Sequence, residues 1–210
     1  MLQKILLSFI VFIFTASPVF AAQSPTVMLQ EATDEALAEL KKDDGAIRKD
    51  IDKLYDLVER LVFPLVDFEA MGKLILGKHW KKATEAQQKD FLAAFSNLLK
   101  YTYTTSLKDF ANQTIRYFPN KTQIKKDKYA TVYSEFVPGN GQANVPVIYK
   151  LRKSEDGSWK AYNLVIENLS VVKNYRTDFN REITATSLDS LIARLQKDQA
   201  SKKVKAERGE

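Results

Sequence analysis

The sequence predicts an α+β domain in which helices pack on a curved, mainly antiparallel sheet of four strands, an arrangement that can close on a solid core or enclose an apolar pocket. From Val27 to about Leu107, apolar residues recur every three or four positions, which is the period of an amphipathic helix. Between residues 114 and 168 the period changes to two, as expected for strands. Helical spacing returns between Val171 and Leu195. Helices followed by strands and then by helices favour an arrangement with the helices on one face of the sheet.

Two helices are expected at the start of the domain, over residues 27–42 and 44–62, because their apolar residues fall on one face. Pro64 follows the second helix and either ends or bends it.

Capping residues define the next two helices. Asp67 can cap a short helix through Leu76, and Gly77 follows as the residue that ends it. Thr84 and Gln87 form the pattern of a capping box, which opens a long helix. The apolar residues of that helix are Phe91, Leu92, Phe95, Leu98, Leu99 and Leu107.

Turn residues separate the strands and predict hairpins. Gly139–Gly141 and Glu155–Gly157 lie between consecutive apolar runs. The four expected strands cover residues 114–119, 128–137, 142–153 and 158–168. Strict alternation then assigns the faces: Val145, Val147, Tyr149 and Leu151 share one face of the third strand, while Tyr162, Leu164 and Ile166 lie opposite Trp159 and Val165 on the fourth.

The N-terminal residues 1–21 are expected to be a cleavable signal peptide. Lys4 is followed by an apolar run over residues 5–14, and Val19 and Ala21 place small side chains before a cut after Ala21. The apolar run is roughly half of the ~20 residues that span a bilayer. We therefore expect export, and a chain with no cysteine suits the bacterial periplasm.

The remainder is expected to form a single domain, residues 22–196, because no linker-like segment or internal repeat interrupts it. The last residues, 197–210, are charged and lack apolar spacing, so we expect a disordered tail.

The composition excludes several classes of enzyme. Without cysteine and with His79 as the only histidine, the chain can build neither a thiolate nucleophile nor a metal site that needs two histidines. The sequence contains no phosphate-binding glycine motif or nucleophile elbow. We therefore expect no catalytic residues, no metal ligands and no cofactor.

The charge balance is basic, with 32 basic and 26 acidic residues and a formal net charge of +6. Lysines occur in short runs, but export argues against a nucleic-acid partner. The alternatives are ordinary solvated faces or attraction to an anionic membrane surface or an acidic partner.

Three stretches of the sequence resemble one family. They are residues 63–80, residues 83–103 and residues 159–179, followed by the segment Leu191–Leu195. Together they are similar to the MlaC family of periplasmic phospholipid-binding proteins, the toluene-tolerance auxiliary (Ttg2-type) family. The resemblance covers about Gln30 to Leu195, nearly the whole domain.

The sequence departs from the family pattern at three positions. Asn163 replaces a frequent Asp, Asn168 replaces a usual Gly, and His79 stands where an aromatic residue is common. Asn tolerates positive φ better than most residues, so the turn at position 168 is expected to survive.

The resemblance implies a phospholipid carrier without enzymatic activity. Such a protein holds acyl chains between the sheet and the helices. It exchanges lipid with an inner-membrane ABC transporter through its MCE-domain subunit, and with an outer-membrane lipoprotein–porin complex. The implied role is to maintain lipid asymmetry of the outer membrane, with phospholipid as the ligand and with the carrier acting as a monomer.

Apolar residues near the expected interface of sheet and helices are the candidate pocket wall. They are Phe63, Phe68, Met71, Leu74, Phe91, Phe95, Leu98, Tyr101, Tyr103, Val147, Tyr149, Tyr162, Leu164, Ile166, Val171 and Tyr175. At each of these positions a place in the solid core is an equal alternative.

Three other functions remain open from the sequence. An exported enzyme could use His79, or a buried Asp/Tyr pair, as acid and base. A chaperone-like protein would bind apolar protein surface in an open groove. A carrier of another apolar ligand would differ from a phospholipid carrier only in its cargo.

Overall fold

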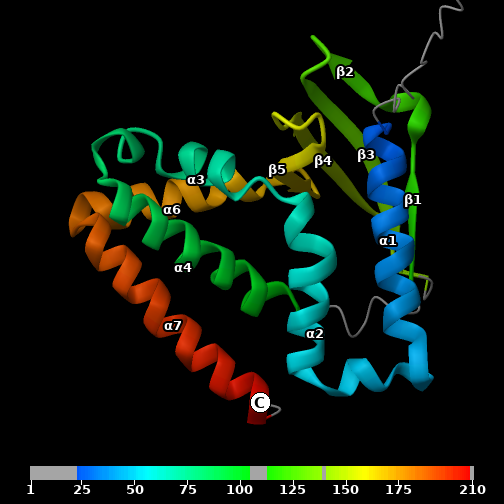
Figure 1. The fold of residues 1–210 in the computed structure, drawn as a ribbon, viewed down its shortest axis with the longest axis horizontal. Coiled ribbons are helices and arrows are strands. Elements are labelled where there is room, and N and C mark those ends of the chain that lie inside the picture. The colour runs from blue at the N-terminus through cyan, green and yellow to red at the C-terminus, as the bar shows by residue number, and fades with distance from the viewer. Residues whose placement is uncertain (1–22, 105–112, 139–140, 209–210) are drawn as a thin grey trace, which may run out of the picture.

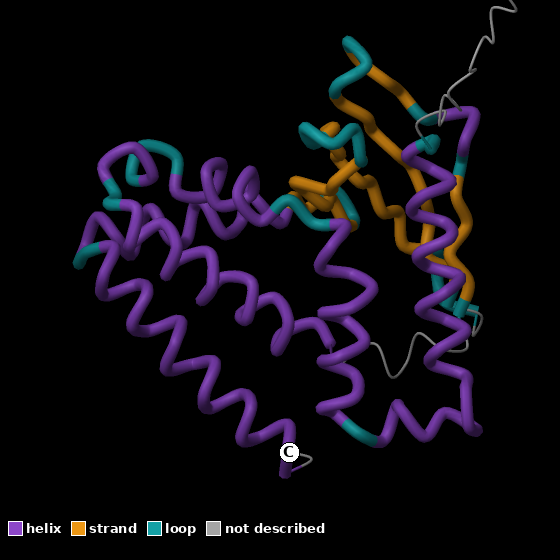
Figure 2. Tube along the Cα trace, viewed as in Figure 1, coloured by secondary structure: helices purple, strands orange, loops and turns teal. Residues whose placement is uncertain are grey.

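The computed structural model describes residues 23–104, 113–138 and 141–208. The expected signal peptide and Leu107 lie outside these ranges. A helical part and a sheet part lie side by side, with helix α1 along the sheet and α2 between the two parts (Figure 1). Figure 2 shows the same division in the distribution of helix and strand along the Cα trace.

The helices begin and end close to the predicted positions. The α-helices are α1 (Pro25–Lys41), α2 (Ile51–Leu57), α3 (Phe68–Leu76), α4 (Glu85–Tyr103), α6 (Val171–Ala185) and α7 (Leu188–Arg208). The predicted caps are confirmed: Asp67 accepts from Ala70 N at 2.8 Å, and Thr84 and Gln87 form the capping box. Gly77 ends α3 with a φ of 52°, a conformation that favours glycine.

The predicted helix over residues 44–62 is broken into shorter pieces. A 3₁₀ helix covers Lys42–Lys49, with Gly45 at a φ of 76°. The backbone then adopts an extended conformation at Asp50. The Asp50 carboxylate accepts from two backbone N–H groups and starts α2 afresh. After α2 the chain continues as a π-helical turn, Val58–Val62, and a short 3₁₀ turn that contains Pro64.

Within the described residues the sheet has six strands, where four were predicted. They are β1 (Thr114–Tyr117), β2 (Gln123–Lys125), β3 (Tyr129–Val137), β4 (Val145–Lys153), β5 (Trp159–Ile166) and β6 (Leu169–Ser170). All strand pairs are antiparallel, in the order β1-β3-β4-β5-β6, and β2 also pairs with β3. The two additional strands, β2 and β6, are too short to produce an alternating pattern in the sequence.

The turn between β5 and β6 survives the replacement of glycine, as expected. Asn168 has a φ of 67° and Glu167 a φ of 48°, so both adopt the left-handed conformation that a tight hairpin needs.

The C-terminal segment differs from the prediction. Helix α7 extends to Arg208, so residues 197–208, expected to be a disordered tail, are helical. The segment is rich in Lys and also contains Ala200 and Ala206, and residues of these types have high helix propensity and extend a helix without an apolar face.

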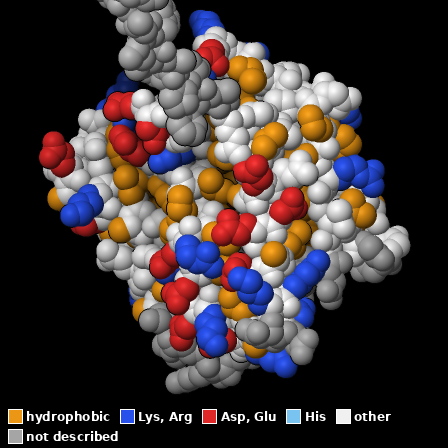
Figure 3. All heavy atoms as spheres, turned by 45° about the vertical axis from the view of Figure 1, so that its right-hand side comes forward, with side chains coloured by type: hydrophobic (Ala, Val, Ile, Leu, Met, Phe, Trp, Pro, Cys, Tyr) orange, Lys and Arg blue, Asp and Glu red, His pale blue; other side chains and the backbone are white. Residues whose placement is uncertain are grey.

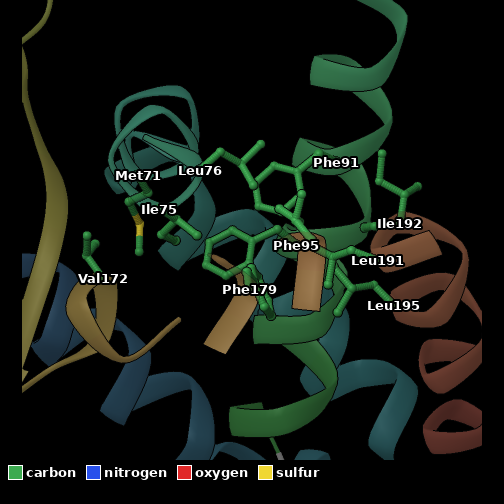
Figure 4. Packing of buried hydrophobic residues seen from close by; sticks show 12 residues of the cluster. Met71, Ile75, Leu76, Phe91, Phe95, Val172, Phe179, Leu191, Ile192 and Leu195 are labelled. Carbon is green, nitrogen blue, oxygen red and sulfur yellow. The ribbon is translucent and has the colours of Figure 1, made fainter. Parts of the chain in front are cut away.

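The largest core cluster lies within the helical part. Phe91 and Phe95 of α4 are fully buried, and their rings stack with centroids 5.7 Å apart. Phe179 of α6 contacts both rings edge-on. Figure 4 shows these aromatic rings meeting Leu191 and Leu195 from α7. This solid packing fixes α4, α6 and α7 and leaves the space for a ligand on the side of the helices that faces the sheet.

Candidate functional site

A bulge in β5 determines which side chains the sheet turns toward the helices. Leu151 of β4 pairs with Ala161, whereas its neighbour Lys150 pairs with Asn163, so Tyr162 is an extra residue in β5. As a result Ala161 and Leu164, three positions apart, line the same cavity. The prediction from strict alternation was therefore wrong for this strand, since it placed Tyr162 on the face of Leu164 and Ile166.

The first of two neighbouring cavities lies between α1, the sheet and the chain after α2. We call it the α1 compartment, and its volume is about 290 Å³. Helix α1 contributes apolar residues one and two turns apart on one face. The wall consists of Leu29, Ala32, Thr33, Ala36, Leu37, Leu40, Leu61, Val62, Leu65, Val66, Gln113, Ile115, Tyr117, Phe136, Tyr149, Ala161 and Leu164.

The second cavity lies between α3, α4 and β5. We call it the α4 compartment, and its volume is about 280 Å³. Its wall consists of Val58, Val62, Phe63, Val66, Phe68, Met71, Leu99, Lys100, Tyr103, Thr104, Leu164, Ile166 and Val171. Met71 is 1% exposed and forms its buried side, whereas Val62, Tyr103 and Ile166 are 38%, 48% and 36% exposed and lie toward solvent.

The two compartments adjoin. Val62, Val66 and Leu164 line both of them. Val62 ends the π-helical turn, and Val66 forms a bridge to Ala161 of β5, so this segment lies between the two spaces. On the face shown in Figure 3, hydrophobic side chains gather in a recess bordered by charged residues. Apolar walls with few polar groups are typical of sites for apolar ligands.

The polar groups of the α1 compartment are mostly bonded to one another. The Tyr117 hydroxyl lies 2.7 Å from the Thr33 hydroxyl and donates to the Leu29 carbonyl at 3.2 Å. Burial is the main reason that the pKa values of Tyr117 and Tyr149 are raised above the usual range of tyrosine. Both hydroxyls therefore stay neutral at ordinary pH, which suits a site for an uncharged chain.

An ion pair with a buried carboxylate joins the two parts of the molecule. Asp67, at the start of α3, receives a hydrogen bond from Arg152 of β4, and its own backbone N–H donates to the Ala161 carbonyl at 2.8 Å. The Asp67 carboxylate is the main reason that the pKa of Arg152 is raised. These contacts hold α3 against the sheet beside both compartments.

The structure brings about half of the predicted pocket residues to the compartments. Those that line one or both are Phe63, Phe68, Met71, Tyr103, Tyr149, Leu164, Ile166 and Val171.

The other predicted residues lie elsewhere. Phe91 and Phe95 form the helical core, and Leu98, Tyr162 and Tyr175 pack against it. Tyr101 packs edge-on against Tyr55 at 4.7 Å, Leu74 is 40% exposed, and Val147 lies on the inner face of β4 outside both walls. Helical spacing identifies an apolar face but does not distinguish a core contact from a cavity wall.

The residues that α1 contributes to the cavity wall were not among the predicted pocket residues. Ala32 and Ala36 lie one turn apart among larger apolar residues, Leu29, Leu37 and Leu40. Small side chains on an apolar helix face leave space above them, and this pattern was the available signal.

His79 and Asn163, two positions at which the sequence departs from the family pattern, form hydrogen bonds within the fold. His79 Nε2 lies 3.0 Å from Asn180 Oδ1. Asn163 Oδ1 accepts from Val172 N at 3.1 Å, and its Nδ2 donates to Ser170 at 3.0 Å, so Asn163 stabilises the start of α6. Among the residues that the structure describes, no three His, Asp or Glu side chains gather as metal ligands, and no helix is long and apolar enough to cross a membrane.

Comparison with known proteins identifies the relatives of this fold and site. The chain is 24% identical over 177 residues to the intermembrane phospholipid transport system binding protein MlaC of Haemophilus influenzae, covering 84% of this chain and 82% of that protein. It is 32% identical over 160 residues to the toluene tolerance protein ttg2D of Pseudomonas putida, covering 76% and 73%.

A solved structure shares the fold. It is a phospholipid-binding protein from Ralstonia solanacearum in complex with a phospholipid, with a TM-score of 0.76 and 27% identity. The match covers 86% of this chain and 99% of that one. The model of the MlaC protein family matches residues 30–197, which is most of the described domain and includes every residue that lines the two compartments except Leu29. On this evidence the chain belongs to the MlaC protein family.

Proposed function

We propose that this protein binds a phospholipid with its acyl chains in the α1 and α4 compartments and carries it through the periplasm. The observation that carries the proposal is the pair of adjoining apolar spaces, which share Val62, Val66 and Leu164. A ligand with two chains joined at one end fits two spaces that meet along a common wall, whereas a single-chain ligand needs only one. The phospholipid named in the Ralstonia structure supports the same ligand class.

The energetics explain why such a carrier is needed. Two acyl chains hold roughly 30 methylenes, and exposing them to water costs on the order of 25 kcal/mol at ~0.8 kcal/mol each. A free lipid therefore does not cross an aqueous compartment at a useful rate. Transfer from a bilayer to a dry pocket is nearly neutral by comparison, because the chains stay out of water at both ends. The direction of transport then depends on partners.

A carrier of this kind needs no catalytic group. The tyrosine and threonine hydroxyls of the α1 compartment are tied to one another and to backbone, and His79 is bonded to Asn180 away from both walls. We therefore propose that the protein binds its ligand without reacting with it.

The proposed location is the periplasm, supported by the signal-peptide pattern of residues 1–21. The name of the Haemophilus relative supports a place in an intermembrane phospholipid transport system. We propose that the protein acts as a monomer that exchanges lipid with an inner-membrane ABC transporter, through its MCE-domain subunit, and with an outer-membrane lipoprotein–porin complex. Its role is then to maintain outer-membrane lipid asymmetry, and the name of the Pseudomonas relative suggests tolerance of toluene as a consequence.

The test is transfer of a fluorescent phospholipid between donor and acceptor vesicles in the presence of the purified protein. The proposal predicts that transfer accelerates in proportion to protein concentration and that the recovered lipid is chemically intact. Recovery of hydrolysed lipid would indicate an enzyme. Absence of transfer, combined with suppression of aggregation of an unfolded test protein, would indicate a chaperone.

A further inference from the structure

Thr104 is a buried polar residue at the wall of the α4 compartment. It follows the last residue of α4, and its backbone N–H donates to the Lys100 carbonyl. The residue is 1% exposed, and its buried Oγ1 has no hydrogen-bond partner among the residues that the structure describes. A buried hydroxyl without a partner is costly in a folded protein, so it calls for an explanation.

Four other threonines in or directly after a helix behave differently. Thr33, Thr177, Thr184 and Thr186 each donate from Oγ1 to the carbonyl four residues earlier, at 2.7–3.0 Å. That interaction is the ordinary way in which a helical threonine satisfies its hydroxyl. Thr104 has the same local partner available, the Lys100 carbonyl, and does not use it.

The position of Thr104 suggests which part of a ligand it meets. The preceding residue, Tyr103, is 48% exposed and lies toward solvent, whereas Met71 forms the buried side of the compartment. Thr104 directly follows Tyr103 in the chain, so its buried side chain lines the compartment one residue away from an exposed wall residue. There a bound acyl chain joins its polar end through an ester, and the ester carbonyl leaves water as the chain enters.

We propose that Thr104 donates a hydrogen bond from its hydroxyl to an ester carbonyl of the bound lipid. The ligand class is then an ester-linked diacyl phospholipid, which the site prefers to an ether-linked lipid of the same chain length. The Thr104 hydroxyl then gains an acceptor, and the ester carbonyl, which has left water, gains a donor. Rotation about χ1 between staggered positions exchanges the methyl and hydroxyl groups and directs Oγ1 into the compartment. This inference rests on the proposed function.

The α1 compartment has a comparable feature. Gln113 lies just before β1 and lines that compartment, and its buried side-chain oxygen has no hydrogen-bond partner in the described part of the chain. Each compartment therefore has a buried polar side-chain atom that finds no partner within residues 23–104, 113–138 and 141–208.

The experiment compares two phosphatidylethanolamines with the same chains, one with two ester linkages and one with two ether linkages. Dissociation constants are measured for the wild-type protein, for Thr104→Val, which keeps the shape and removes the hydroxyl, and for Thr104→Ser, which restores it. Thr177→Val is the matched control, because its hydroxyl is exposed and bonded within α6.

A hydrogen bond of this kind predicts that the wild type binds the diester roughly 5- to 10-fold more tightly than the diether. The ratio should fall to near one in Thr104→Val and return in Thr104→Ser, and it should stay at the wild-type value in Thr177→Val. Without lipid, Thr104→Val should melt at or above the wild-type temperature, because an unsatisfied hydroxyl is removed.

Three results would overturn the inference: no ester preference in the wild type, an unchanged ratio in Thr104→Val, or a large loss of stability in lipid-free Thr104→Val. A wild type that binds both lipids equally contradicts only the role of Thr104. A wild type that binds neither lipid contradicts the proposed function itself.

Discussion

Filling the α1 compartment should block lipid binding without unfolding the protein. Ala36 of α1 lines this cavity of about 290 Å³ and is half-buried. Replacement by Trp directs an indole ring into a space that the protein itself leaves empty. Because no packed side chain has to move, the fold should tolerate the change.

The expected loss of binding free energy follows from the part of the apolar cavity that the indole ring fills and that an acyl chain can then no longer occupy. The indole occupies the space of roughly five methylenes, and at ~0.8 kcal/mol each their loss weakens binding by about 4 kcal/mol. A loss of that size raises the dissociation constant roughly a thousand-fold.

The assay is titration of the lipid-free protein with a fluorescent phospholipid, together with thermal unfolding of the same preparation. Ala38→Trp is the matched control, because Ala38 lies on the exposed face of the same helix. Ala38→Trp should bind as the wild type does. If Ala36→Trp binds phospholipid as tightly as Ala38→Trp while both melt at the wild-type temperature, the α1 compartment does not hold the ligand.

Three further predictions concern stability. Asp67→Ala removes the N-cap of α3 and the partner of Arg152, so the free energy of unfolding should fall by about 2 kcal/mol in urea denaturation; an unchanged midpoint would show that these contacts do not stabilise the fold. Thr84→Ala should cost about 1 kcal/mol through loss of the capping box, checked in the same way. Burial raises the pKa of Tyr117 above its ordinary value near 10, so the native state retains this proton at a pH where the unfolded chain loses it. The free energy of unfolding should therefore fall above pH 10, by up to ~1.4 kcal/mol per pH unit for this residue, and the fall should be shallower in Tyr117→Phe. An equal slope in both proteins would contradict the assignment.

Local signals in the sequence were sufficient for most of the fold. The caps at Asp67 and Thr84 and the end of α3 at Gly77 each depend on hydrogen bonds or backbone angles within one turn. The hairpins depend on short turns between alternating runs, and the structure confirms their antiparallel pairing. The break at Asp50 was missed because a helical pattern of apolar residues continues through it, while the capping side chain restarts the helix.

The site was predictable only in part, for a physical reason. Phe91 and Phe68 are both aromatic residues on an apolar helix face. Phe91 is fully buried in the core cluster of the helical part, whereas Phe68 packs at the side of that cluster and also lines a cavity. That difference arises from how α3, α4 and the sheet are placed, and no local pattern records it. The bulge at Tyr162 likewise depends on pairing with β4, so the reversal of faces along β5 was not visible in the sequence.

The central claim, that this protein carries phospholipid, is tested most directly by native mass spectrometry. The protein is purified from a periplasmic extract without detergent, and the bound lipid is identified after organic extraction. The account predicts a mature chain without residues 1–21 that carries one phospholipid per molecule. A lipid-free mass, together with failure of the folded protein to acquire phospholipid from liposomes, would contradict it.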